Sequence, residues 1–206
     1  MNPIAMSTEL HERGTSHVVL VHGFMDTGSV FKSLRRQLER NGHSCLAPNL
    51  RPRDARHGIE ALAEHLRQEI EDQIPNQQSF SMIGFSMGGL VARHYLQQLG
   101  GAKRCQRLIT ISSPHQGTVM AWFHPSKGAK QMRPGSIFLK ELAATESQLG
   151  EIPVISYRTP IDLLILPSRS SEWQRATNIS FRVFLHPMMV RAKSVMNDIS
   201  MRLREN

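Results

Sequence analysis

The sequence is poor in cysteine. Among its 206 residues only Cys45 and Cys105 occur, and neither belongs to a CxxC pair or to a Cys/His pattern with zinc-ligand spacing. Structural zinc sites are built from such closely spaced pairs, so the sequence predicts no metal site and no disulfide framework. We expect two free, buried thiols, as in proteins of a reducing compartment; one bridge between them is the alternative.

Long apolar segments are also missing. No window contains the roughly 18 to 20 apolar residues that a membrane-spanning helix needs. Residues 1–16 form a polar tail in which Glu9, Glu12 and Arg13 stand where a signal peptide would have its apolar segment. These absences lead us to expect a cytoplasmic protein that does not cross a membrane.

The charge is basic but dispersed along the chain. Lys and Arg number 25 against 17 Asp and Glu, which gives a formal net charge of +8. Basic runs such as Arg35-Arg36 and Lys103-Arg104 are short, whereas nucleic-acid-binding surfaces cluster their cations. The sequence therefore predicts no nucleic-acid partner. Peripheral contact with an anionic membrane is the hypothesis that the net charge leaves open.

Apolar periodicity divides the chain into alternating strands and helices. Short apolar runs predict strands over 17–21, 44–48, 80–84, 107–112, 152–158 and 179–185. Apolar residues at helical spacing predict helices over 29–40, 59–74, 88–99, 136–148 and 188–202. This alternation predicts one α/β domain over 1–206, with about six mainly parallel strands and helices on both faces. In that architecture, catalytic groups gather at the carboxyl ends of the strands.

Residues 115–135 follow the fourth expected strand without any clear periodicity. The segment is rich in Gly, Pro, Lys and Met, and it interleaves apolar residues such as Trp122 and Phe123 with basic ones. Long irregular connections are usually functional, so we expect a short cap loop over the site. Covering the core is the alternative role.

The clearest chemical signal is Gly84-Phe85-Ser86-Met87-Gly88-Gly89, a G-x-S-x-G pattern between an expected strand and an expected helix. Glycines two positions either side of the serine permit a strained turn that exposes the hydroxyl. The N-terminus of the following helix directs free N–H groups at the site, and Met87 N–H is the natural oxyanion donor. The pattern predicts Ser86 as a nucleophile; a simple glycine turn is the alternative.

Two further segments extend this pattern. The first expected strand ends in Val21-His22-Gly23-Phe24, and residues 112–118 read SSPHQGT. Together with the GFSMGG elbow, and in this order, they resemble the α/β-hydrolase superfamily, in particular small bacterial lipases and esterases. The resemblance covers about residues 18–190. It implies that the backbone N–H of Phe24, the residue after His-Gly, is the second oxyanion donor beside Met87.

The resemblance also implies an acid and a base in the chain order nucleophile, acid, histidine. His186 is the candidate base because it directly follows the last expected strand, whereas the other later histidines lie in an expected helix or the irregular segment. Asp162 follows the preceding strand, in an apolar run ending in proline that resembles the family's acid loop. Glu172 is the alternative acid. We expect His22 and His115 to brace loops and not to react.

Apolar residues flank this predicted site. We expect Met25, Phe85, Leu164 and Met188 to bind substrate, because an apolar and adaptable lining suits an acyl chain. Ordinary core packing is the alternative, since apolar residues at strand ends are usually buried.

The resemblance implies a cofactor-free hydrolase of lipid-like acyl esters that works through an acyl-serine intermediate. A thioesterase or an acyltransferase would use the same three residues, so both are alternatives. The remaining alternative is a binding module that has the same fold but no catalytic activity.

Overall fold

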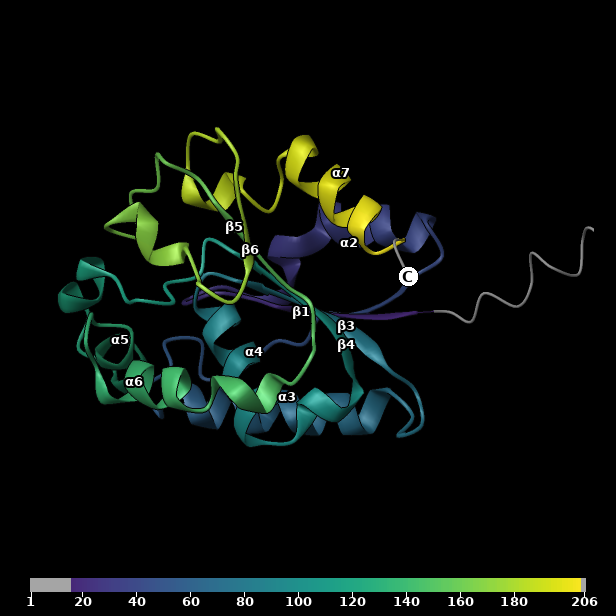
Figure 1. The fold of residues 1–206 in the computed structure, drawn as a ribbon, viewed down its shortest axis with the longest axis horizontal. Coiled ribbons are helices and arrows are strands. Elements are labelled where there is room, and N and C mark those ends of the chain that lie inside the picture. Colours follow the sequence, from purple (N-terminus) through teal and green to yellow (C-terminus); the bar gives the residue numbers. More distant parts are fainter. Residues whose placement is uncertain (1–15, 205–206) are drawn as a thin grey trace, which may run out of the picture.

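The computed structural model describes residues 16–204, in which six strands form one sheet (Figure 1). Across the sheet the order is β2-β1-β3-β4-β5-β6, and all neighbouring strands are parallel. The strands are β1 (His17–Val21), β2 (Ser44–Leu46), β3 (Phe80–Phe85), β4 (Cys105–Ile111), β5 (Val154–Arg158) and β6 (Thr177–Ser180). The predicted α/β class with about six mainly parallel strands is confirmed.

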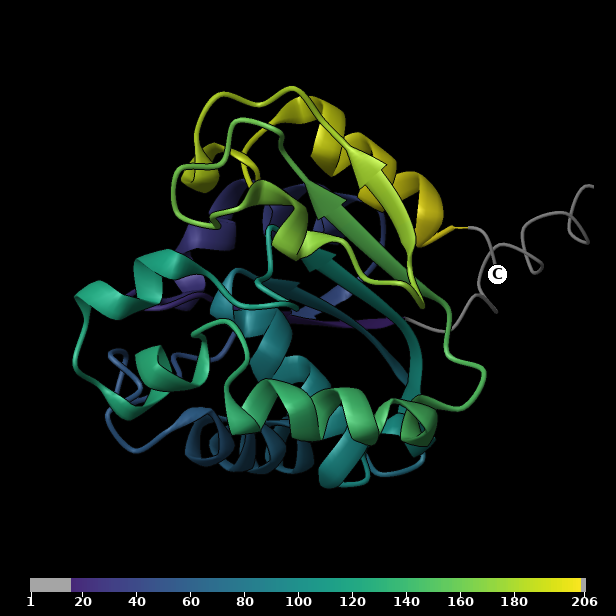
Figure 2. The same ribbon diagram turned by 60° about the vertical axis from the view of Figure 1, so that its left-hand side comes forward.

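Helices cover both faces of this sheet (Figure 1; Figure 2). One face carries α2 (Lys32–Arg40) and α7 (Lys193–Arg202), and the other carries α3 (Ile59–Gln73), α4 (Met87–Gln98), α5 (Lys127–Gln131) and α6 (Ile137–Ala144). No helix within residues 16–204 has the length and apolar character needed to span a bilayer. Apart from Ser16, the predicted polar tail lies outside the described residues, and the single domain over 1–206 stays a prediction.

Strand β1 explains why the first apolar run is unbroken. Val19 and Val21 face the core layer under α3 and α4, whereas Val18 and Leu20 face the layer under α2 and α7. All four side chains are fully buried. A strand covered on both faces has no polar side, so its sequence does not alternate.

The last strand is shorter than the predicted range 179–185. It ends at Ser180 because its neighbour β5 ends at Arg158, and one further bond from Phe181 N–H to the Arg158 carbonyl closes the ladder. Without a partner the chain leaves the sheet. The prediction that His186 directly follows a strand was therefore wrong: the residue opens a 3₁₀ turn, His186–Met188, beyond an irregular connection.

The sequence predicted an irregular segment over 115–135, but part of this segment is regular. It contains a 3₁₀ segment, Val119–Phe123, and the short helix α5, whose first turn is capped by the Ser126 hydroxyl accepting from Ala129 N–H. Its small apolar side chains reach the core, since Ala121 and Ala129 are buried. These elements are too short to show a helical period, which hid them from the pattern of the sequence.

Cys45 and Cys105 are free thiols, as expected. Cys105 is buried, whereas Cys45 is only half-buried. Burial raises the pKa of each thiol to about 12, so both are protonated at neutral pH.

The strand order reverses beside β1. The chain runs from β1 outward to β2, then returns to β3 on the other side and continues to β6. At such a switch point the loops after the two central strands diverge and leave a crevice at the carboxyl edge of the sheet. Gly23 and Phe24 follow β1 and Ser86 follows β3, so the topology brings these residues to one place.

The turn from β3 to α4 is closely packed. A Cβ atom on Gly84 would lie 2.5 Å from Gly89 Cα, and one on Gly88 would overlap the carbonyl oxygen of Val21. Both positions therefore exclude any side chain, and α4 begins in direct contact with the end of β1.

We predict that Gly88→Ala lowers the free energy of unfolding by about 3 kcal/mol, because the added methyl forces α4 away from the β1 backbone. Gly100→Ala is the matched control: its φ is 80° with no atom near the added Cβ, so only backbone strain of about 1 to 2 kcal/mol is expected. Equilibrium unfolding in urea measures both. Equal losses in the two variants would contradict the packing argument.

Candidate active site

Ser86 occupies a strained backbone conformation between β3 and α4. Its φ is 54° and its ψ is −126°, a region that residues other than glycine rarely adopt. The Ser86 N–H donates to the Ile111 carbonyl at 2.8 Å, and the Ser86 carbonyl accepts from Gly89 N–H at 3.1 Å. These bonds hold the turn in place, and the half-buried serine lines a cavity.

The loop after β1 lies against the serine. A Cβ on Gly23 would be only 2.9 Å from Ser86 Cβ, so glycine is required for this approach. The backbone N–H groups of Phe24 and Met87, the two predicted oxyanion donors, have no hydrogen-bond acceptor among the described residues. Met87 is also the first residue of α4, where the helix dipole favours negative charge.

His22 braces this loop, as expected. Its Nε2 accepts from Leu50 N–H at 2.9 Å, which leaves Nδ1 to donate to the Gly23 carbonyl at 2.9 Å. Burial lowers the pKa of His22, and the hydrogen bond to Gly23 offsets this only in part. The imidazole is thus a neutral linker between the loops after β1 and β2.

Asp162 and His186 form a buried pair. His186 Nδ1 lies 2.8 Å from Asp162 Oδ2, and Asp162 Oδ1 accepts the N–H groups of Leu164 and Ile165 at 2.9 Å each. Burial alone would raise the pKa of Asp162, but the His186 hydrogen bond and charge together with these two N–H groups hold it below its ordinary value. The Asp162 carboxylate is ionised and holds the His186 ring through Nδ1, so Nε2 of His186 is not used in this contact.

The alternative acid, Glu172, is engaged elsewhere. Its carboxylate pairs with Arg158 Nε at 2.8 Å. The His186 ring instead lies over Phe85, with ring centroids 4.8 Å apart. Of the two candidates, only Asp162 contacts the histidine.

Ser86 and His186 line the same cavity, which has a volume of about 360 Å³. Phe24 also lines it, and so do Met25, Phe85 and Leu164, three of the four residues expected to bind substrate; that they bind substrate stays a prediction. The prediction for Met188 was wrong: of its 3₁₀ turn, His186 and Pro187 line the cavity, whereas Met188, the last residue of the turn, does not and is partly exposed to solvent. The Met87 side chain is buried in the core, which leaves its N–H as its contribution to the site.

The sequence did not single out several residues that complete the lining. Most come from the predicted cap loop 115–135, which therefore forms one wall of the cavity; they are Thr118, Met120, Ala121, His124, Ala129 and Met132. Ile165, beside Leu164, also contributes. The SSPHQGT motif was the signal that could have located Thr118.

Thr118 ties this wall to the loop that carries Asp162. Its hydroxyl donates to the Leu164 carbonyl at 2.8 Å and accepts from Leu166 N–H at 2.9 Å. A backbone bond of 3.0 Å from Val119 N–H to the Leu166 carbonyl adds to the clamp. The position of Asp162 thus depends on a residue far away in the chain.

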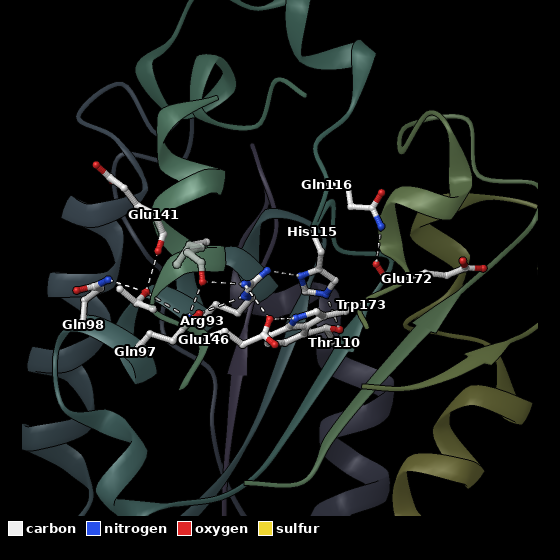
Figure 3. Close-up of polar contacts among 12 residues, drawn as sticks. Arg93, Gln97, Gln98, Thr110, His115, Gln116, Glu141, Glu146, Glu172 and Trp173 are labelled. Atoms are coloured by element: carbon white, nitrogen blue, oxygen red, sulfur yellow. Dashed lines mark hydrogen bonds and ion pairs between the residues drawn. The ribbon is translucent and has the colours of Figure 1, made fainter. Parts of the chain in front are cut away.

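His115, at the start of the segment 115–135, belongs to a buried polar network around Arg93 (Figure 3). Arg93 donates to His115 Nδ1 at 3.3 Å, so the opposite nitrogen of His115 donates to Thr110 Oγ1 at 3.0 Å. The guanidinium also lies 4.0 Å from the centre of the Trp173 ring and donates to the Leu142 carbonyl. Burial lowers the pKa of Arg93 to about 10, which still leaves it charged. His115 therefore organises a loop, as expected.

Within the part of the chain that the structure describes, no three His, Cys, Asp or Glu side chains come together as metal ligands. The expectation of a cofactor-free protein stays a prediction.

The strand-turn-helix geometry around Ser86 is that of a nucleophile elbow, which defines the class of α/β hydrolases. Sequence comparison agrees with this class. The family described as alpha/beta hydrolase fold matches residues 16–136, more than half of the chain, and the protein belongs to this family.

Solved structures share the fold at low sequence identity. The mature lipase BlEst2 of Bacillus licheniformis superposes with a TM-score of 0.74 at 16% identity, covering 93% of each chain. Lipase B of Aspergillus fumigatus gives 0.74 at 17% identity, over 87% of this chain and 50% of its own. A thermophilic esterase from Thermogutta terrifontis superposes with a TM-score of 0.65 at 17% sequence identity, covering 93% of this chain and 91% of the esterase. No curated protein sequence matches significantly.

The buried Asp162–His186 pair should make the free energy of unfolding depend on pH. Because the folded-state pKa of Asp162 lies below its ordinary value of 3.8, its charge stabilises the fold above about pH 4, and this contribution disappears as pH falls through the lowered pKa. We expect Asp162→Asn to lower the free energy of unfolding by about 2 kcal/mol at neutral pH and by much less near pH 2 to 3.

Urea unfolding across this pH range measures the difference. Asp72→Asn, which changes an exposed aspartate on α3, should follow the wild-type profile. If Asp162→Asn lowered the free energy of unfolding by the same amount at every pH, the charge of the Asp162 carboxylate would have no part in the stability of the fold.

Proposed function

We propose that this protein is a serine hydrolase of carboxylic esters, with Ser86 as nucleophile, His186 as base and Asp162 as the acid that orients the base. One observation carries the proposal: the strained Ser86 and the Asp162-bound His186 line one cavity at the switch point of the sheet. The esterase and lipase structures that share the fold support the same reaction class.

The chemistry follows from these positions. Ser86 Oγ attacks the acyl carbonyl while His186 Nε2 takes its proton, and the oxyanion accepts from Phe24 and Met87 N–H. Collapse of this intermediate breaks the ester bond, and the departing alcohol takes the proton from His186. Water, deprotonated by His186, then attacks the acyl-serine; the bond between the acyl carbon and Ser86 Oγ breaks, His186 returns the proton to Ser86 Oγ, and the carboxylic acid is released. Asp162 holds the imidazole in the tautomer that each step needs.

The lining of the cavity favours an acyl chain over a polar substrate. Flexible apolar residues, including Met120 and Met132, line it together with Phe24 and Leu164. Its volume of about 360 Å³ is near the lower end of small-molecule sites, so we propose short to medium acyl chains. A thioester would fit the same machinery, and thioesterase or acyltransferase activity remains the alternative.

We also propose that the mouth of the cavity contacts a lipid surface. Exposed apolar residues directly follow or precede lining residues: Trp122 and Phe123 come after Ala121, and Leu163 comes before Leu164. Phe123 is 81% exposed and Trp122 61%. Together with the net charge of +8, such a rim suits the surface of an anionic membrane. A cytoplasmic location stays a prediction from the sequence.

The nucleophile is tested with p-nitrophenyl esters of graded chain length. We expect wild-type activity to peak at roughly four to eight acyl carbons, as the cavity volume suggests. Ser86→Ala should reduce kcat by about 10⁵- to 10⁶-fold without loss of folding. Ser33→Ala, at an exposed serine on α2, is the matched control and should retain full activity. A fully active Ser86→Ala protein would refute the proposal.

Contact with a lipid surface is tested by sedimentation with vesicles of phosphatidylcholine and phosphatidylglycerol. Phe123→Ser should weaken binding about tenfold, because a Phe side chain no longer enters the interface. Ile137→Ser is the matched control, since Ile137 on α6 is 75% exposed but does not border the cavity. Equal effects of the two variants would contradict a role for the rim.

A further inference from the structure

A second cavity, of about 700 Å³, is lined by residues of the loops after β1 and β2 and is larger than the candidate active-site cavity. Cationic side chains dominate its lining, which consists of Thr27, Asn49, Arg51, Pro52, Arg53, Arg56 and His57. It contains neither Ser86 nor His186, so the proposed hydrolysis does not account for it. These arginines come from one loop, between β2 and α3.

The arginine loop is bonded directly to the loop that carries the proposed oxyanion donor Phe24. Met25 N–H donates to the Arg53 carbonyl at 2.9 Å, and Gly28 N–H donates to Asn49 Oδ1 at 3.0 Å. The bond from Leu50 N–H to His22 adds a third link. Met25 itself lines the active-site cavity. Thr27, further along the same loop, lines the arginine-rich cavity, so the loop after β1 borders both cavities.

The loop is also held on its outer side. The Ala55 carbonyl accepts from Gly58 N–H and from Gly128 N–H, each at 2.9 Å, and α5 packs so closely that a Cβ on Gly128 would overlap Ala55. Arg51 N–H donates to His65 Nδ1 at 3.3 Å. The backbone beneath the cationic side chains is thus fixed before any ligand binds.

The charges of this cavity are largely uncompensated. Arg56 pairs with Asp54 at 3.1 Å, but the guanidinium groups of Arg51 and Arg53 have no acceptor among the described residues. The other nearby acid, Asp26, accepts from Thr27 N–H and lines the active-site cavity. Exposed arginines in a concave, preformed site provide forked donors that match phosphate oxygens.

We propose that this cavity binds a phosphate group, carried by the substrate whose acyl ester occupies the active-site cavity. The inference rests on the proposed ester hydrolysis and specifies its substrate class: an amphiphilic ester with an acyl chain and a phosphate. Arg51 and Arg53 are the principal ligands. Free phosphate offers the same chemistry, so the experiment separates the two sources.

Binding is measured first, without catalysis. Inorganic phosphate is titrated calorimetrically into Ser86→Ala protein at constant ionic strength. The triple variant Ser86→Ala/Arg51→Gln/Arg53→Gln should bind phosphate at least about tenfold more weakly, because charge-assisted hydrogen bonds are lost. Ser86→Ala/Arg36→Gln is the matched control: Arg36 is an exposed arginine on α2, outside the cavity, and its loss should leave binding unchanged.

Turnover then identifies the source of the phosphate. Two substrates with the same acyl ester are compared, 1-hexanoylglycerol 3-phosphate and uncharged 1-hexanoylglycerol. We expect wild type to favour the phosphate ester about tenfold in kcat/KM, mainly through KM, and Arg51→Gln/Arg53→Gln to lose this preference. Activity of that variant on the uncharged ester should persist, and Arg36→Gln should behave as wild type.

The outcomes separate the two proposals. Phosphate binding without a substrate preference would overturn the substrate assignment and identify a free-phosphate site. If the protein hydrolyses uncharged esters but neither binds phosphate nor prefers the phosphate ester, the phosphate site is overturned and the proposed hydrolysis stands. Phosphate binding in a protein without any esterase activity would uphold the site and refute the proposed hydrolysis.

Discussion

The contact between the start of α4 and the end of β1 is the constraint on which the rest of this structure depends. Gly88 lies so close to the Val21 carbonyl that no side chain fits between them, and a Cβ on Gly84 would lie only 2.5 Å from Gly89 Cα. This packing forces the turn at Ser86 into a left-handed conformation of the kind that typically costs about 1 to 3 kcal/mol. It also places the Met87 N–H and the loop after β1 around the same point.

The remaining site residues are positioned by loops that depend on one another. Asp162 receives two backbone N–H groups of its own loop, that loop is clamped by Thr118, and the segment of Thr118 is anchored through His115 to the buried Arg93. A buried polar network is costly unless all its members are paired, but a paired one admits few alternative arrangements. This network therefore helps to hold the Asp162–His186 pair in one position relative to the turn at Ser86.

Two cavities of opposite character meet at the loop after β1. The one that contains Ser86 is apolar, and its neighbour is lined by arginines. Met25 lines the first cavity, Thr27 on the same loop lines the second, and Met25 N–H donates to the Arg53 carbonyl. The proposed substrate, with an acyl chain and a phosphate, would match both environments, and the exposed Trp122 and Phe123 directly follow the lining residue Ala121.

The sequence by itself determined the features that depend on short-range geometry. Glycines at 84 and 88 specify the elbow, the unbroken apolar run of β1 specifies a strand covered on both faces, and alternating periods specify a parallel α/β sheet. Asp162 and His186 were proposed as acid and base from the family resemblance and chain order, and the structure brings their side chains into contact, although the strand before His186 ends earlier than predicted.

Other features were decided only by the tertiary structure. The end of β6 is set by the length of β5, and the arginines of residues 51–56 become one site because their loop is bonded to the loop after β1. Each of these depends on partners distant in the chain. Side-chain patterns record local periodicity and turn geometry, whereas pairing between distant backbones exists only once the chain has folded.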